Sequence, residues 1–273
     1  MSKYAMLNYN DNVAVAVSGG KDSLSLLYIM KKILDSRHRA TNLIAITIDE
    51  GIKGYRDESL KIVQEFCSNI HVPNKVLSYK EIFGMDMDEA IKLRSAEKMT
   101  SCSICGTFRR RAMDLAAEAV GANVVATAHN LDDQVQSFMI NILAGDVERI
   151  GWTYPEPVSY GTNKLKKIKP FVELYEQEIV FYALQRGIPF QTEECPYMHE
   201  SIRTDLRQFL NKFETDHPGI KYNIYNSTMK ISKTMRSSLR TASVQTCSIC
   251  RRECTSEICA ACNTIKSLTT EGL

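Results

Sequence analysis

A hexapeptide of glycine, hydroxyl and charged residues, SGGKDS, carries the strongest chemical signal in this chain. It follows the apolar run Val13–Val17 and precedes Leu24–Leu34, whose apolar spacing is typical of a helix. Two glycines let the backbone approach an oxyanion closely, and the free N–H groups at a helix N-terminus favour negative charge. Its spacing is not that of a Walker A loop. We therefore expect these six residues to bind the phosphates of ATP: Ser18, Gly19, Gly20, Lys21, Asp22 and Ser23.

Two CxxC pairs lie close together near the C-terminal end, Cys247 with Cys250 and Cys259 with Cys262. Each pair presents two thiolates to one tetrahedral ion, so the four together predict a structural zinc site. An iron–sulfur centre is the alternative occupant. Metal binding would supply the folding energy of this segment, which has few apolar residues. Cys254 is expected to be a bystander, or a thiol that exchanges with a ligand.

Three further cysteines are candidates for a second metal site. Cys102 and Cys105 form a CxxC pair without a second pair nearby, and Cys195 lies far along the chain in Glu194–Tyr197. Three thiolates would leave one iron of a cubane open to a substrate sulfur. The alternative is that Cys102 and Cys105 are ordinary cysteines near a helix start and that Cys195 is unrelated to them.

A second loop, Thr127–Asp133, follows another apolar run and opens a helix. Asn130 or Asp132 would serve as a helix N-cap, which is a common role for these residue types. Adjacent carboxylates at Asp132 and Asp133 would also suit Mg²⁺ on a polyphosphate. His129 is either a packed histidine or a participant in the chemistry.

Basic residues gather in two segments, Lys92–Arg111 and Lys164–Lys169. Such runs are often solvated surfaces, but the first flanks the Cys102 pair, where contacts with phosphates are plausible. We expect Arg109 to reach ATP. The residues predicted to contact RNA are Arg110, Arg111, Lys166 and Lys167.

Apolar runs alternate with helical segments along the first half of the chain, which predicts an α/β fold with a doubly wound parallel sheet. Ligands of such sheets bind beyond the carboxyl ends of the strands, where Ser18–Ser23, Asp49–Gly54 and Ala128–Asp133 lie. The expected strands are Val13–Val17, Leu43–Ile48, Lys75–Leu77 and Asn123–Thr127. The expected helices are Leu24–Leu34, Ser59–Ser68, Thr107–Val120, Gln134–Leu143, Glu173–Arg186, Glu200–Phe213 and Tyr222–Leu239.

The remaining features set the domain organisation. We expect an N-terminal extension at 1–11, an ATP-binding domain at 12–240 and a zinc ribbon at 241–273, with an irregular or hairpin excursion over Trp152–Pro170. A net charge of +2 does not by itself indicate nucleic-acid binding. The chain shows neither a secretion signal nor a membrane span, and its cysteines are better metal ligands than disulfides in a reducing compartment. A cytoplasmic location without membrane contact is the expectation.

The hexapeptide resembles the PP-loop of the ATP pyrophosphatases, a family whose domain has a Rossmann-like fold. Together with CSICGTFRR, TAHNLDDQ, ECPY and the terminal CxxC pairs, it resembles the archaeal and eukaryotic tRNA 2-thiouridine synthetases from about Asn12 to the C-terminus. The family commonly has an N-terminal zinc ribbon, and no cysteine precedes Val13, so RNA affinity is expected to be weaker. Ala128 stands where glycine is common, which narrows the space near the nucleotide.

The resemblance implies a site and a reaction. ATP would bind Ser18 to Ser23, with Ile48 near the adenine and with Ala128 and Arg109 completing the nucleotide site. Asp133 would be the catalytic carboxylate. A [4Fe-4S] cluster would be held by Cys102, Cys105 and Cys195, and Zn²⁺ by the four terminal cysteines.

The expected reaction is adenylation of the C2 oxygen of a tRNA uridine, with Mg²⁺, followed by sulfur transfer. The sulfur would come from free sulfide or a ubiquitin-like carrier, and a homodimer is expected. Phe108–Arg110 and Ala144–Asp146 favour the wobble uridine over a T-loop uridine. Three alternatives stay open: a persulfide thiolase without iron, another PP-loop activator, and an ATP- and metal-bearing RNA-binding module without turnover.

Overall fold

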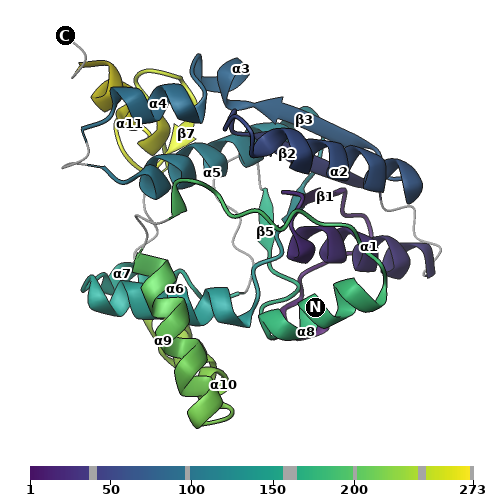
Figure 1. The fold of residues 1–273 in the computed structure, drawn as a ribbon. Helices are drawn as coiled ribbons and strands as arrows, with labels where there is room; N and C mark the ends of the chain where they lie inside the picture. Colours follow the sequence, from purple (N-terminus) through teal and green to yellow (C-terminus); the bar gives the residue numbers. More distant parts are fainter. Residues whose placement is uncertain (37–41, 96–98, 156–164, 199–201, 239–243, 271–273) are drawn as a thin grey trace.

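The fold is a parallel sheet with helices on both faces (Figure 1). The structure, a computed structural model, describes residues 1–36, 42–95, 99–155, 165–198, 202–238 and 244–270. The strands run in the order β3-β2-β1-β4-β5, and every neighbouring pair is parallel. Their bounds are β1 Val13–Ala16, β2 Leu43–Asp49, β3 Asn74–Ser78, β4 Val124–Ala126 and β5 Lys166–Ile168. The expected doubly wound α/β fold is confirmed.

The helices are numbered along the chain. Those of the first half are η1 Ser2–Tyr4, α1 Lys21–Ser36, α2 Arg56–Asn69, α3 Tyr79–Phe83, α4 Met87–Leu93 and α5 Ser101–Ala119. The others are α6 Leu131–Leu143, α7 Val147–Gly151, α8 Glu176–Gln185, α9 Ile202–Asp216, α10 Ile220–Ser238 and α11 Ala260–Thr270. Among the described residues, none of the helices has the length and apolar content to cross a membrane.

Two apolar cores lie on opposite faces of the sheet, because successive strand residues point to opposite sides. Val13 and Val15 of β1 join one core with α1, α2, α6 and α8, whereas Ala14 joins the other core with α4 and α5. Residues 1–11 are not detached from this body, since Tyr4 and Met6 are buried in the first core. The Tyr4 hydroxyl lies 3.0 Å from that of Tyr225 on α10.

Strand β5 is the main departure from the expected elements. The basic segment at 164–169 was expected to be irregular or part of a hairpin, but Lys166–Ile168 pairs in parallel with Val124–Ala126 and forms one edge of the sheet. Ile168 is fully buried, and Lys166 pairs with buried Asp11 at 3.1 Å. The expectation failed because a strand of three residues with two lysines has too little apolar patterning to be recognised. Residues 156–164 of the expected excursion, Lys164 among them, lie outside the described residues.

Helix α5 starts at Ser101, six residues before the expected Thr107. Thr100 is its N-cap and accepts a hydrogen bond from the Ser103 N–H at 3.2 Å. Cys102 and Cys105 therefore lie on the first turns of a helix and not in a preceding loop. Their spacing of three places them on the same side of it.

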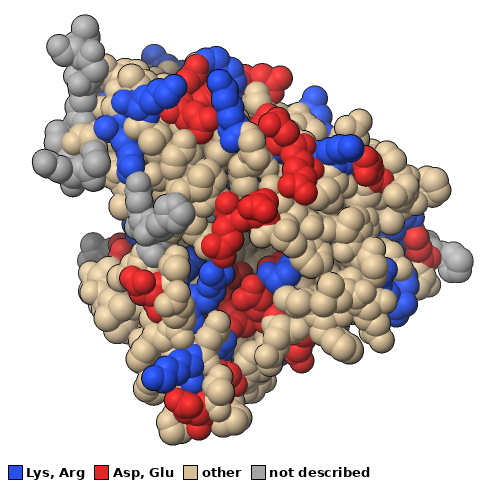
Figure 2. Space-filling model, in the orientation of Figure 1, with Lys and Arg blue, Asp and Glu red and all other residues tan. Residues whose placement is uncertain are grey.

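The C-terminal segment forms a small ribbon beside helices α4 and α5 (Figure 1). Strands β6 Gln245–Thr246 and β7 Glu253–Cys254 pair antiparallel, and α11 follows. Phe83 packs against the buried cysteines of this segment. The space-filling view shows a hollow at the centre of one face of the molecule, with acidic and basic side chains around it (Figure 2).

Candidate active site and metal centres

The phosphate loop joins β1 to α1 in a tight turn. Gly19 has a φ of +91°, and a Cβ there would lie 2.7 Å from the Ser59 Cβ, so both the backbone conformation and the space require glycine. The Ser23 hydroxyl accepts from the Ser18 N–H at 3.1 Å and donates to the Gly20 carbonyl at 3.0 Å. The Gln191 N–H donates to the Gly19 carbonyl at 3.0 Å. The loop is thus preorganised at the N-terminus of α1.

Lys21 and Asp22 begin helix α1 and are the charged groups of the loop. The Lys21 ammonium lies 2.7 Å from Glu176 of α8 and 3.4 Å from Asp22. Burial, together with the negative charge of Glu176, raises the pKa of Asp22 to about 6, although Lys21 opposes the shift. Lys21 is therefore held by a carboxylate that a phosphate can replace.

A buried arginine, Arg56, ties the phosphate loop to the end of β2. Its guanidinium donates to the Ser18 carbonyl at 2.8 Å and to the Ile48 carbonyl at 2.6 Å. Its charge is balanced by Glu50, whose carboxylate lies 2.7 Å from Arg56 Nε. Both side chains are about 5% exposed. Sequence reasoning missed this pair, because nothing in the local pattern indicates that the two side chains meet.

Glu50 also connects this clamp to the cysteines of α5. Its other oxygen lies 2.9 Å from Arg109, and the same guanidinium donates to Cys105 Sγ at 3.3 Å. Tyr79 donates to the Cys105 carbonyl at 2.9 Å and lies 3.6 Å from its sulfur. Arg109, which was predicted to reach ATP, therefore lies between Glu50 and the Cys105 sulfur. Its contact with nucleotide stays a prediction.

Cys195 comes to the same place from a distant part of the chain. Cys105 and Cys195 pack on the same apolar core, and the Cys102 thiol donates weakly to the Tyr197 carbonyl at 3.9 Å. Burial raises the pKa of Cys195, and the neighbouring Cys105 and Cys102 add to the shift. All three thiols are free of disulfides. Three thiols from two segments, with the Arg109 guanidinium donating to one of the sulfurs, form a set that fits an iron–sulfur cluster.

The two carboxylates after β4 have different surroundings. Asp132 is buried, pairs with Lys221 of α10, and accepts from the Glu176 N–H at 2.8 Å. Asp133 is 35% exposed and lies 3.8 Å from Arg203. It also forms a capping box with Asn130, which confirms the N-cap role of that residue. Asp132 is therefore occupied in packing, and Asp133 is the carboxylate accessible to a substrate.

His129 and Lys169 lie beside Asp133. The Nδ1 of His129 is 2.8 Å from the Thr127 hydroxyl, and Lys169 donates to the Gln134 Oε1 at 3.1 Å. Desolvation of the ring by the surrounding protein, together with the positive charge of Lys169, lowers the pKa of His129 to about 4. His129 is therefore a neutral imidazole at physiological pH. Lys169 was not expected at the site, since the sequence placed it in an irregular or hairpin segment that was predicted to contact the RNA backbone.

The four C-terminal cysteines form the tighter of the two thiol groups. Over the residues that the structure describes, they are the set whose ligand atoms all lie within 4.8 Å of one another. The sulfurs of Cys250 and Cys259 are 3.8 Å apart. Zn–S bonds of ~2.3 Å in tetrahedral geometry place two sulfurs ~3.8 Å apart. The donor set and its spacing fit Zn²⁺.

The predicted RNA-contacting residues occupy different surroundings. Arg110 is exposed and donates to the Thr107 hydroxyl, whereas Arg111 donates to Cys250 Sγ at 3.2 Å and so joins α5 to the ribbon. Lys167 is half exposed and pairs with Asp114 at 2.6 Å. Lys166 is 15% exposed in its pair with Asp11, a placement that favours a role in the sheet. Contact with RNA stays a prediction for these residues.

Two further residues, Ile48 and Ala128, were predicted to contact the nucleotide. Ile48 is buried at the end of β2, with its carbonyl bonded to Arg56. Ala128 is half-buried and packs on the first core. Both stay predictions. Lys98, from the first basic segment, lies outside the described residues.

The phosphate loop, the strand order and the ends of the strands define a PP-loop protein, and residues 2–214 match the PP-loop domain family. The chain is 34% identical over 263 residues to cytoplasmic tRNA 2-thiolation protein 1 of Chlamydomonas reinhardtii, covering 96% of this chain and 73% of that protein. The protein of the same name in Laccaria bicolor is 33% identical over 260 residues, covering 94% and 72%.

A solved structure agrees with these relatives. The U34-tRNA thiolase NcsA of Methanococcus maripaludis, determined with its [4Fe-4S] cluster, superposes with a TM-score of 0.81 at 28% identity, covering 96% of this chain and 83% of that one. The chain belongs to the PP-loop family of tRNA 2-thiolation proteins.

Proposed function

We propose that this protein is a cytoplasmic, ATP-dependent tRNA sulfurtransferase that replaces the C2 oxygen of the wobble uridine with sulfur. One observation carries the proposal. A continuous series of contacts runs from the Ser18 carbonyl through Arg56, Glu50 and Arg109 to the Cys105 sulfur. These contacts join the phosphate-binding loop directly to the thiol of Cys105. The names of the two relatives support a tRNA substrate, and that of the solved thiolase supports position 34.

In the first step, the uridine O2 attacks the α-phosphorus of ATP, and the bond to the β-phosphate oxygen breaks to release pyrophosphate. Negative charge grows on the phosphoryl oxygens and on the leaving group. Lys21 and the N-terminus of α1 stabilise this charge. Asp133 holds Mg²⁺ or accepts the uridine N3 proton.

In the second step, a sulfide adds to C2 and the C2–O bond breaks, so AMP leaves with the original oxygen. No electron is transferred in either step, because the sulfur enters at the oxidation level of sulfide. Arg109 lies next to Cys105 and is placed to stabilise the departing phosphate. Neutral His129 is placed to donate or accept a hydrogen bond near Asp133.

Cys102, Cys105 and Cys195 are the residues that would hold the [4Fe-4S] cluster, and the bound cluster would supply an open iron position for the sulfide. The four terminal cysteines would hold Zn²⁺ as structural support, since four thiolates leave no ligand position open. The sulfur comes from free sulfide or a ubiquitin-like carrier. The protein acts as a homodimer.

The test combines unmodified tRNA, ATP, Mg²⁺ and sulfide with protein handled without oxygen. Mass spectrometry of the digested tRNA is expected to show one 2-thiouridine at position 34 for each AMP and pyrophosphate released. Pyrophosphate without thiouridine would indicate another PP-loop activator. Binding of tRNA and ATP without pyrophosphate would indicate a module without turnover. Thiolation by protein that lacks iron would show that sulfide adds to the activated uridine without a cluster.

A further inference from the structure

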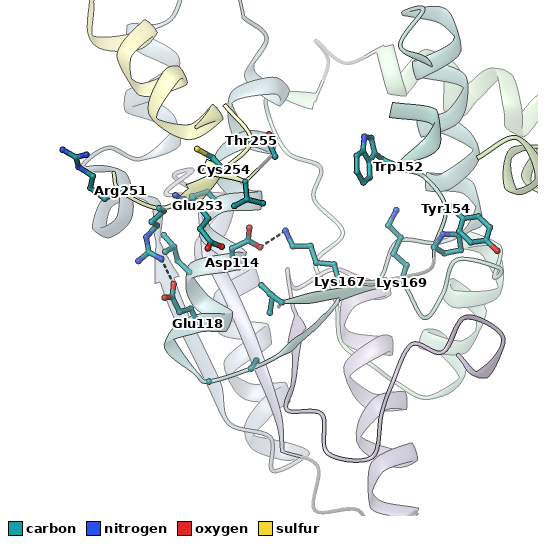
Figure 3. Close-up of a pocket in the computed structure, with 18 of the residues that line it drawn as sticks. Asp114, Glu118, Trp152, Tyr154, Lys167, Lys169, Arg251, Glu253, Cys254 and Thr255 are labelled. Atoms are coloured by element: carbon teal, nitrogen blue, oxygen red, sulfur yellow. Dashed lines mark hydrogen bonds and ion pairs between the residues drawn. The ribbon is translucent and has the colours of Figure 1, made fainter. Parts of the chain in front are cut away.

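A cleft of about 790 Å³ runs along the edge strand β5 (Figure 3). One wall is the outer side of α5 with the ribbon residues Arg251–Thr255. The opposite wall is formed by Trp152, Tyr154, Pro155 and Arg236 of α10. Lys167 of β5 and Lys169, which directly follows the strand, lie between the two walls. None of the phosphate-loop residues 18–23 lines the cleft.

The cleft has an excess of positive charge. Six of its lining residues are Lys or Arg, and three are Asp or Glu. Two of the three acids are already paired, Asp114 with Lys167 and Glu118 with Arg252. A lining of this kind attracts a polyanion such as a nucleic-acid backbone.

Aromatic rings stand beside these charges. Trp152 is 39% exposed on the wall of the cleft. Tyr154 is fixed by an edge contact with Tyr4 at 6.2 Å between ring centroids and by Arg236 at 5.7 Å from its ring. Aromatic faces next to basic side chains are the usual platform for the unstacked bases of single-stranded nucleic acid.

One end of the cleft reaches the reaction centre. Lys169 lines the cleft and also bonds to Gln134, the residue next to Asp133. In Figure 3 Lys169 lies on the side of the cleft that carries Trp152. A strand bound along β5 would therefore deliver a base to Asp133 while its neighbours remain in the cleft.

We propose that this cleft binds the single-stranded loop of the tRNA, with Trp152 stacking on a base adjacent to the target uridine and with Lys169 contacting the phosphate between them. The proposal rests on the proposed function and adds the place and the manner of RNA binding. Trp152 and Lys169 are thereby positioning residues for the reaction.

Trp152 reports directly on this contact, because it is the one tryptophan of the chain. An unmodified anticodon stem-loop, titrated into the intact protein, is expected to quench its fluorescence saturably. Trp152→Ala is expected to weaken binding of a labelled stem-loop ~10-fold or more, as loss of one stacked base does. Trp152→Phe, which keeps a stacking ring, restores most of the affinity. Phe181→Ala is the matched control, since Phe181 is 67% exposed on α8, away from the cleft.

Quenching by the stem-loop but not by an RNA duplex of equal length, with the expected order of variants, would support the proposal. Equal quenching by the duplex or by an acidic peptide would overturn it, as would Trp152→Ala protein that binds the stem-loop as tightly as wild type. The readouts separate this proposal from the proposed function. If wild-type protein thiolates tRNA but the stem-loop does not change the Trp152 fluorescence, only the proposal that the cleft binds RNA is overturned. If the stem-loop binds and quenches the fluorescence but no thiolation occurs, only the proposed reaction is overturned.

Discussion

Glu50→Gln tests the contacts that join the phosphate loop to the thiol site. Glu50 and Arg56 are each about 5% exposed, and their charged atoms are 2.7 Å apart. Removing one partner of a buried pair costs ~3–5 kcal/mol, because the other charge is left uncompensated. Arg109 is half exposed and its charge can be solvated, so its ion pair with Glu50 contributes little to the free energy of unfolding. We therefore expect the free energy of unfolding to fall by ~3 kcal/mol, which lowers the melting temperature by ~6–12 °C in a chain of this size.

Thermal unfolding followed by circular dichroism at fixed zinc concentration measures the effect. Glu118→Gln is the matched control, because the Glu118–Arg252 pair is about half exposed and is worth at most ~1 kcal/mol. A double-mutant cycle of Glu50→Leu with Arg56→Met isolates the coupling, and the double variant is expected to be more stable than the sum of the single losses predicts. The reasoning about the Glu50–Arg56 pair is wrong if Glu50→Gln has the same melting temperature as Glu118→Gln and if the stability losses of the two single variants add up to that of the double variant.

The other predictions concern the loop charge and the two thiol sites. Burial raises the pKa of Asp22 to about 6, so ionisation costs the folded state; stability falls as pH rises from ~4 to ~6 and stays reduced above that range. Asp22→Asn should therefore be more stable than wild type by ~1–2 kcal/mol at pH 8 and equal to it at pH 4, which urea unfolding measures; a constant difference at both pH values would contradict the shift. Cys102→Ala should lose iron and thiolation but keep zinc and ATP affinity, measured by metal analysis and isothermal titration; retained thiolation would exclude the cluster. Cys250→Ser should lose zinc and the hydrogen-exchange protection of residues 245–270 but leave strands β1 and β4 protected; protection of the ribbon without zinc would refute the metal site.

Much of the nucleotide edge could be predicted, because strong local patterns specify it. The Gly-Gly turn between an apolar run and a helix requires the observed φ at Gly19, and Asn130 with Asp133 forms the capping box that their spacing permits. The CxxC pairs at Cys247 and Cys259 have the spacing of a single tetrahedral ion. The capping boxes that begin α3 and α4 are also visible as S-x-x-E and D-x-x-E in the sequence, although these short helices were not expected.

The rest depends on contacts between distant segments. The Lys221–Asp132 pair joins residues 89 apart, and it takes Asp132 out of reach of a substrate. The Arg56–Glu50 clamp has no signature in the residue types around it. Lys169 reaches the site because the short strand β5 pairs with β4, and three residues carry too little pattern to show this.

Metal and sulfide analysis of protein purified without oxygen tests the central claim most directly. With Cys102, Cys105 and Cys195 as one ligand set and the terminal cysteines as another, we expect ~3–4 iron, a similar amount of acid-labile sulfide and one zinc per chain, with the broad visible absorption of iron–sulfur thiolate sites. The iron should disappear in Cys195→Ala while the zinc remains. Zinc without iron, in protein that still binds ATP and thiolates tRNA, would contradict the account.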